Sequence, residues 1–174
     1  MSRSIKSLLA AAILFTPLSA MAFDVDAYKA TVTESVRELL TGTIADPAAS
    51  LARQEKLMAM GIEACKENAK ETPADAKMME LVISSAAGMK AMTPDQLEAK
   101  WGDSGDAGDA IGQPLKALDQ FSKTRNYIDL VMHPARAYTF IKDWQTSKNK
   151  QALAEAKGEL TEVLEHLEKL RKAK

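Results

Sequence analysis

The chain has 174 residues, a length that suits one domain with a hydrophobic core. Its 23 basic and 24 acidic residues give a net charge of -1, which argues against the concentrated positive field that nonspecific nucleic-acid binding requires. A single cysteine, Cys65, excludes an internal disulfide, a C-x-x-C redox pair and covalent attachment of a c-type haem.

Residues 1–22 have the order of regions found in a secretory signal peptide. Arg3 and Lys6 provide positive charge, an apolar run follows, and small residues precede a cleavage point after Ala22. The apolar run is too short to cross a bilayer, so we expect no stable membrane insertion. We therefore predict that the leader is removed and that one all-helical domain, residues 23–174, works in the periplasm or as a secreted protein.

Proline and glycine divide this domain into segments whose apolar residues recur at helical spacing, and no segment alternates as a strand would. Asp46 precedes a proline, where its carboxylate can cap the free amides of a helix start. Thr93 and Gln96 form a capping box. The sequence therefore predicts an all-α bundle of five to six helices. The predicted helices cover about 24–40, 46–68, 72–92, 93–101, 114–144 and 150–172.

Three of these segments carry further expectations. The helix over 72–92 has a wide apolar arc and is expected to be the most buried. Pro134 removes a backbone donor and leaves the carbonyl of Leu130 without its usual partner, so we expect a kink there or a junction of two helices. The last helix, from Lys150 to Lys172, carries an apolar seam at three-four spacing, which packs within the bundle or forms a homodimer.

The strongest candidate site surrounds His133. Asp129 precedes it by four residues, so in a continuous helix the carboxylate can orient the imidazole and raise its basicity. Arg125 and Arg136 add guanidinium groups that suit anions. One hypothesis is a pocket here for a carboxylate, a phosphate or a haem edge. The favoured interpretation is structural: His133 ends one helix, Pro134 begins the next, and Arg136 lies on a solvated face.

Aromatic residues occur near this segment and near the loop that precedes it. That loop, residues 102–112, is rich in Gly and Asp but lacks the ligand pattern of an EF-hand, and whether it has a function is left open. The predicted ligand-binding residues are Arg125, Asp129, His133, Arg136, Tyr138 and Trp101.

Methionine supports a second hypothesis. Thioether sulfur from Met58 or Met132, together with His133, suits copper and also ligates haem b. The same methionines lie on apolar stripes, where flexible Met side chains fill gaps in a core, and core packing is the favoured interpretation. Cys65 shares a stripe with Met58 and is expected to be a buried, inert thiol rather than a reactive one.

The segment Met92-Thr93-Pro94-Asp95-Gln96 is similar to the short L-T-x-x-Q motif of small periplasmic helical stress chaperones, with Met in place of Leu. The resemblance implies an exported helical protein that binds partners through a concave apolar surface. It covers five residues, and the capping box accounts for Thr93 and Gln96 by itself. The similarity is therefore not taken as membership of that family.

The sequence contains no recognisable nucleophile–base pair, and it has two histidines, of which His166 is expected on the charged flank of the last helix. We therefore predict an exported, soluble, non-catalytic protein that binds a small ligand or a protein partner in the cell envelope. The alternative function is a periplasmic haem or copper carrier that uses His133 and a Met ligand.

Overall fold

The computed structural model describes residues 23–119 and 122–172, and over these ranges the chain is helical and has no strand. The predicted leader, with its cleavage point after Ala22, lies outside the described residues. The α-helices are α1 (Val25–Leu39), α2 (Pro47–Glu71), α3 (Ala76–Met89), α4 (Pro94–Trp101), α5 (Lys123–Ser147) and α6 (Lys150–Lys172). Within the described ranges, no helix combines the length and the apolar character needed to cross a membrane.

Two helices, α2 and α4, begin at the capping residues that the sequence predicts. The predicted start of a helix at 114 was wrong, because the segment after Pro114 forms a short 3-10 turn over Leu115–Ala117 and α5 begins only at Lys123. The Asp46 carboxylate accepts a hydrogen bond from the Ala49 amide at 3.0 Å, which starts α2, and Ser122 caps α5 in the same way. Thr93 and Gln96 form the predicted capping box at the start of α4. These local bonds satisfy amides that have no partner inside the helix, and the sequence alone locates the starts of α2 and α4.

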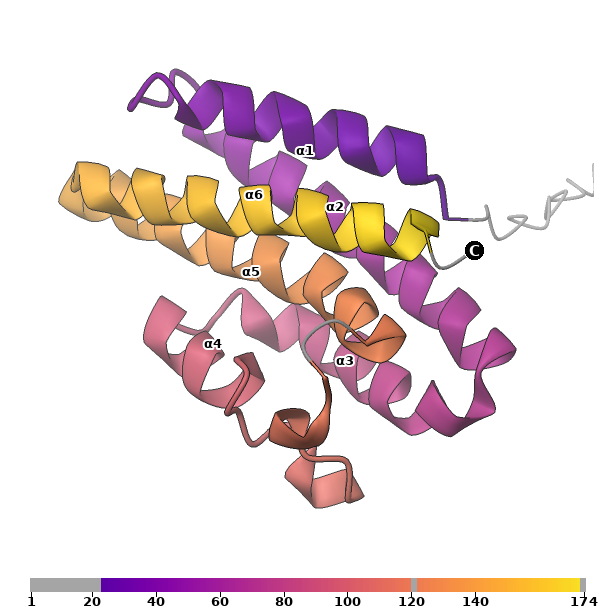
Figure 1. The fold of residues 1–174 in the computed structure, drawn as a ribbon. Helices are drawn as coiled ribbons and strands as arrows, with labels where there is room; N and C mark the ends of the chain where they lie inside the picture. The colour runs from indigo at the N-terminus through magenta and orange to yellow at the C-terminus, as the bar shows by residue number, and fades with distance from the viewer. Residues whose placement is uncertain (1–22, 120–121, 173–174) are drawn as a thin grey trace, which may run out of the picture.

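The bundle is arranged around α5, which packs against α2 and α6 and also contacts α3 and α4 (Figure 1). Every residue from Arg125 to Ala135 is buried. The prediction that the helix over 72–92 is the most buried was wrong. That segment forms a short 3-10 turn and α3, which packs mainly on α2 and α5, and its residue Ile83 stays partly exposed.

The predicted junction at Pro134 was also wrong, because α5 runs without a break from Lys123 to Ser147. The physical reason lies on a distant helix. The hydroxyl of Tyr28 on α1 donates a hydrogen bond to the Leu130 carbonyl at 2.7 Å and so replaces the donor that proline lacks. The freed carbonyl is thus bonded inside the core.

The contact between α2 and α5 is close and largely apolar. A Cβ atom at Gly61 would lie 2.4 Å from the Leu130 carbonyl oxygen, so this crossing requires glycine. Nearby, the buried thiol of Cys65 donates to the Tyr127 carbonyl at 3.4 Å. Burial raises the pKa of this thiol to about 12, which agrees with the expected inert cysteine.

The last helix has the predicted bounds, and its apolar seam is buried against α1 and α5 of the same chain. The seam residues are Leu153, Ala156, Leu160, Val163, Leu167 and Leu170. The seam is therefore covered within one chain, and a homodimer through this helix would have to use its other face.

Candidate functional site

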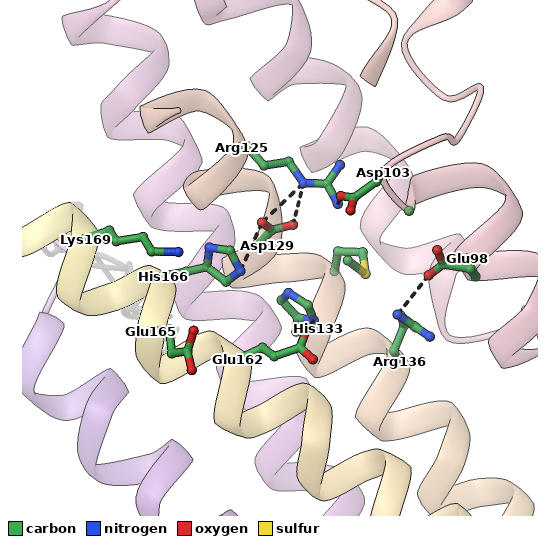
Figure 2. Close-up of a pocket in the computed structure, with 12 residues that line it drawn as sticks. Glu98, Asp103, Arg125, Asp129, His133, Arg136, Glu162, Glu165, His166 and Lys169 are labelled. Carbon is green, nitrogen blue, oxygen red and sulfur yellow. Dashed lines mark hydrogen bonds and ion pairs between the residues drawn. The ribbon is translucent and has the colours of Figure 1, made fainter. Parts of the chain in front are cut away.

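A polar cavity of about 410 Å³ lies between α5, α6 and the C-terminal end of α4 (Figure 2). Its walls carry charged side chains from three helices and from the loop after α4. The lining residues are Glu98, Gly102, Asp103, Arg125, Asp129, Met132, His133, Arg136, Glu162, Glu165, His166 and Lys169.

One wall comes from α5, on which Arg125, Asp129, His133 and Arg136 follow one another at intervals of four, four and three residues. This spacing places the four side chains on one face of a continuous helix. The structure therefore brings together four of the six residues that the sequence analysis selected. The other face of α5 packs on α2, so the helix is apolar on one side and charged on the other.

The remaining two candidates lie outside the cavity wall. Trp101 is fully buried at the end of α4. Tyr138 is partly exposed and its ring lies under the ammonium of Lys90, 5.8 Å away. Tyr138 follows Arg136 by two residues, which turns it roughly 200° around the helix and away from the charged face.

The opposite wall comes from α6 and was missed by the sequence analysis. His166 was expected on an exposed flank, but its side chain is 13% exposed and stacks on His133 with ring centroids 5.3 Å apart. Glu159, one residue before the seam position Leu160, is also buried. A sequence signal existed: Glu159, Glu162 and His166 recur at three-four spacing beside the apolar seam.

His133 is held by carboxylates. Its Nδ1 lies 2.7 Å from Glu159 Oε2 and 3.8 Å from Glu162 Oε2. Burial by itself lowers the pKa of this histidine, but the hydrogen bond to Glu159 and the charge of Asp129 outweigh burial, and the net effect is a raised pKa.

The pKa of His166 is shifted in the opposite direction from that of His133. The Nδ1 atom of His166 lies 2.7 Å from the side-chain oxygen of Asn126, and its Nε2 lies 3.4 Å from Asp129 Oδ2. Burial, followed by the positive charges of His133 and Lys169, lowers the pKa of His166 to about 3, so the ring is neutral at neutral pH. Since an amide oxygen only accepts, Nδ1 carries the proton and the lone pair on Nε2 faces Asp129.

Each arginine of the cavity is already paired with two carboxylates. Arg125 lies 3.0 Å from Asp129 and 3.3 Å from Asp103. Arg136 Nη1 joins α4 to α6, at 2.9 Å from Glu98 and 3.0 Å from Glu159. The expected anion-binding forks are thus occupied by the protein's own acidic groups.

Asp129 lies at the centre of this charged group and is almost completely buried. Burial raises its pKa, and the positive charges of His133 and Arg125 oppose that rise without cancelling it. A buried carboxylate of this kind favours a proton or another positive charge close to it.

Two sets of side chains have the composition of a metal site. One contains Asp129, His133 and His166, and the other contains His133, Glu159 and Glu162; within each set the ligand atoms lie within 4.8 Å of one another. Met132 lines the cavity, whereas Met58 is buried in α2 and does not line it. Imidazole and carboxylate, rather than thioether, are therefore the donors that this site offers.

Comparison of the chain with protein-family models, with curated proteins and with solved structures found no match. The chemistry of the cavity is consequently the basis on which a function can be assigned.

Proposed function

We propose that the chain is an exported, non-catalytic binding protein whose cavity takes a small polar ligand with a cationic centre. The observation that carries this proposal is the charge balance of the walls. Five lining residues are carboxylates, three are lysine or arginine, and both arginines are already paired. A cation entering the cavity therefore finds uncompensated negative charge, whereas an anion finds none of its usual partners free.

The composition of the walls favours binding over covalent catalysis. Among the described residues that line the cavity there is no hydroxyl or thiol side chain that could act as a nucleophile. The two imidazoles stack on each other, and each is oriented by a polar side chain through Nδ1. Such an arrangement holds the ring nitrogens in fixed positions, where they can contact a bound molecule.

A small ligand is favoured over a protein partner. Leu40 is the one large apolar side chain that is strongly exposed among the described residues. The concave apolar surface implied by the resemblance to helical stress chaperones has at most a small counterpart among the described residues, such as a hollow of about 180 Å³ between α2 and α3. Protein partners of the apolar-docking kind usually require a larger patch.

The periplasmic haem b or copper carrier is the less favoured function. A haem ring requires a mostly apolar slot, but charged side chains dominate these walls. Copper(I) prefers sulfur ligands, and of the two predicted methionines Met132 alone reaches the cavity.

Export of the chain is supported by a contact at the first described residue. The backbone nitrogen of Phe23 donates to Glu67 Oε1 at 2.7 Å, and the Phe23 ring packs edge-on against Tyr28. Cleavage after Ala22 would convert this amide into an ammonium group beside a carboxylate, which strengthens the contact. The mass of the protein recovered from its native envelope tests this, and a chain that retains residues 1–22 would contradict it.

Native mass spectrometry of the envelope-purified protein tests ligand binding. We expect a bound small species in the wild type and in the control Arg37→Ala, whose exposed side chain lies on α1. The same species should be lost from His133→Ala and from Glu162→Gln, which removes one of the carboxylates that line the cavity, with circular dichroism confirming that both variants remain folded. A species bound equally by all four proteins, or no bound species in any preparation, would overturn the proposal.

A further inference from the structure

The distances between the side chains of the cavity distinguish hydrogen bonds from metal-ligand pairs. Zinc–nitrogen bonds of about 2.0–2.1 Å in a tetrahedral site place neighbouring ligand atoms about 3.3 Å apart. His166 Nε2 and Asp129 Oδ2 are 3.4 Å apart, which matches the separation expected of two ligand atoms on one ion. His133 Nδ1 and Glu159 Oε2 are 2.7 Å apart, which is the length of a charge-assisted hydrogen bond and too short for two ligands of one ion.

The tautomers place two acceptors opposite each other. Asn126 takes the Nδ1 proton of His166, so the Nε2 lone pair faces a carboxylate oxygen with no proton of its own between them. Two such atoms repel each other unless a proton or a metal ion lies between them. Arg125 already compensates the charge of the buried Asp129 at 3.0 Å, so a metal ion here would act by removing the repulsion between Oδ2 and Nε2.

The Nε2 atom of His133 is the third candidate ligand atom, beside His166 Nε2 and Asp129 Oδ2. The Nδ1 atom of His133 is occupied by Glu159, which leaves Nε2 as the atom that His133 offers to the group formed with Asp129 and His166. Figure 2 shows the three side chains converging from α5 and α6 on the space between these helices.

We propose that His133 Nε2, His166 Nε2 and Asp129 Oδ2 bind one divalent transition-metal ion of the zinc type, with the fourth position open to the cavity. Imidazole nitrogen together with carboxylate oxygen suits Zn²⁺, Co²⁺ and Ni²⁺. The inference rests on the proposed function, because it names the cationic centre that this cavity takes.

The surrounding residues act as positioning residues for these ligands. Glu159 and Asn126 hold the two imidazoles through Nδ1, as carboxylates and carbonyls do around histidine ligands elsewhere. Arg125 contacts Asp129 and is itself compensated by Asp103, so it orients the carboxylate. Arg136 does the same for Glu159.

Titration of the metal-free mature chain with Zn²⁺ and with Co²⁺ tests the site. We expect one ion per chain by calorimetry, and visible bands typical of tetrahedral Co²⁺. His166→Gln should weaken binding by more than about 100-fold, because loss of an outer support alone costs about 10- to 100-fold. Glu159→Gln, which removes such a support, should fall within that smaller range.

Glu165→Gln is the matched control, because Glu165 lines the same cavity on the same helix, one residue before His166. Its affinity for Zn²⁺ should stay within about threefold of the wild type, as expected for loss of one exposed charge. Long-range ¹H–¹⁵N spectra should show Zn²⁺ shifting Nε2 of both histidines.

The possible outcomes separate this inference from the proposed function. Failure of the wild type to bind either ion, or equal binding by His166→Gln, would overturn the metal site. If an organic species is nevertheless lost from Glu162→Gln in the mass spectrometry above, the cavity remains a binding site without a metal. If the wild type binds neither ion and mass spectrometry detects no bound species, both proposals are overturned.

Discussion

The two faces of α5 differ in packing and in charge. Toward α2, the helix is close-packed around Gly61, and the Leu130 carbonyl, which Pro134 leaves without its usual donor, is satisfied by Tyr28. Toward α4 and α6, the same helix presents a line of charged side chains to a cavity. Both faces are buried, so burial alone does not identify a site. The difference is that the first face has no volume left to fill, whereas the second retains both volume and charge.

The largest expected effect concerns the charged face. Asp129→Ala should lower the free energy of unfolding by about 3–5 kcal/mol, because it leaves the buried guanidinium of Arg125 without its main partner. Urea unfolding measures this loss. The double variant Arg125→Met/Asp129→Leu should recover most of the stability while losing Zn²⁺ binding. A loss below about 1 kcal/mol in the single variant would mean that water screens this pair.

The apolar face is tested next by Gly61→Ala. The added methyl group would meet the Leu130 carbonyl, so the two helices must separate, at a cost of about 2–3 kcal/mol. Gly158→Ala in α6 is the matched control, because apart from the neighbouring residues and backbone of its own helix nothing lies within 4 Å of the new Cβ. The control should raise stability by about 0.5–1 kcal/mol. Equal effects of the two substitutions would contradict the close crossing.

Tyr28→Phe removes the hydroxyl that satisfies the Leu130 carbonyl. We expect a loss of about 1–2 kcal/mol in urea unfolding, the usual cost of leaving a buried acceptor without a partner. Tyr138→Phe should change stability by less than about 0.5 kcal/mol, since Tyr138 is partly exposed and away from this contact. If Tyr28→Phe is equally neutral, the continuity of α5 through Pro134 has another cause.

The smallest effect is a chemical one at Cys65. Because burial raises the pKa of the thiol to about 12, the native protein should react with iodoacetamide at pH 8 far more slowly than the urea-unfolded chain. The unfolded thiol ionises near its ordinary pKa of 9.0, so the stability that this group contributes is present below pH 9 and lost as pH rises toward 12. Fast alkylation of the native protein would show that the α2–α5 contact opens readily.

The sequence predicted features that depend on neighbouring residues. Caps located the starts of α2 and α4, the three-four pattern located α6, and the spacing of Asp129 and His133 located one wall of the cavity. These features depend on local hydrogen bonds and on which residues share a helix face.

Features set by contacts between distant helices were not predictable in this way. The register of α6 against α5 places His166 beside His133, and nothing near His166 in the sequence determines that register. The same holds for Pro134, whose expected break is prevented by a hydroxyl from α1. Trp101 and Tyr138 were chosen for their proximity in sequence, which does not guarantee a shared face.

The central claim is that the charged face of α5 is built to hold a cation, and anomalous X-ray diffraction at the zinc edge tests it most directly. Crystals of the mature chain grown with Zn²⁺ should give one strong peak bonded to His133 Nε2, His166 Nε2 and Asp129 Oδ2. A cavity without a peak, or zinc bound instead to exposed carboxylates at the surface, would contradict the claim.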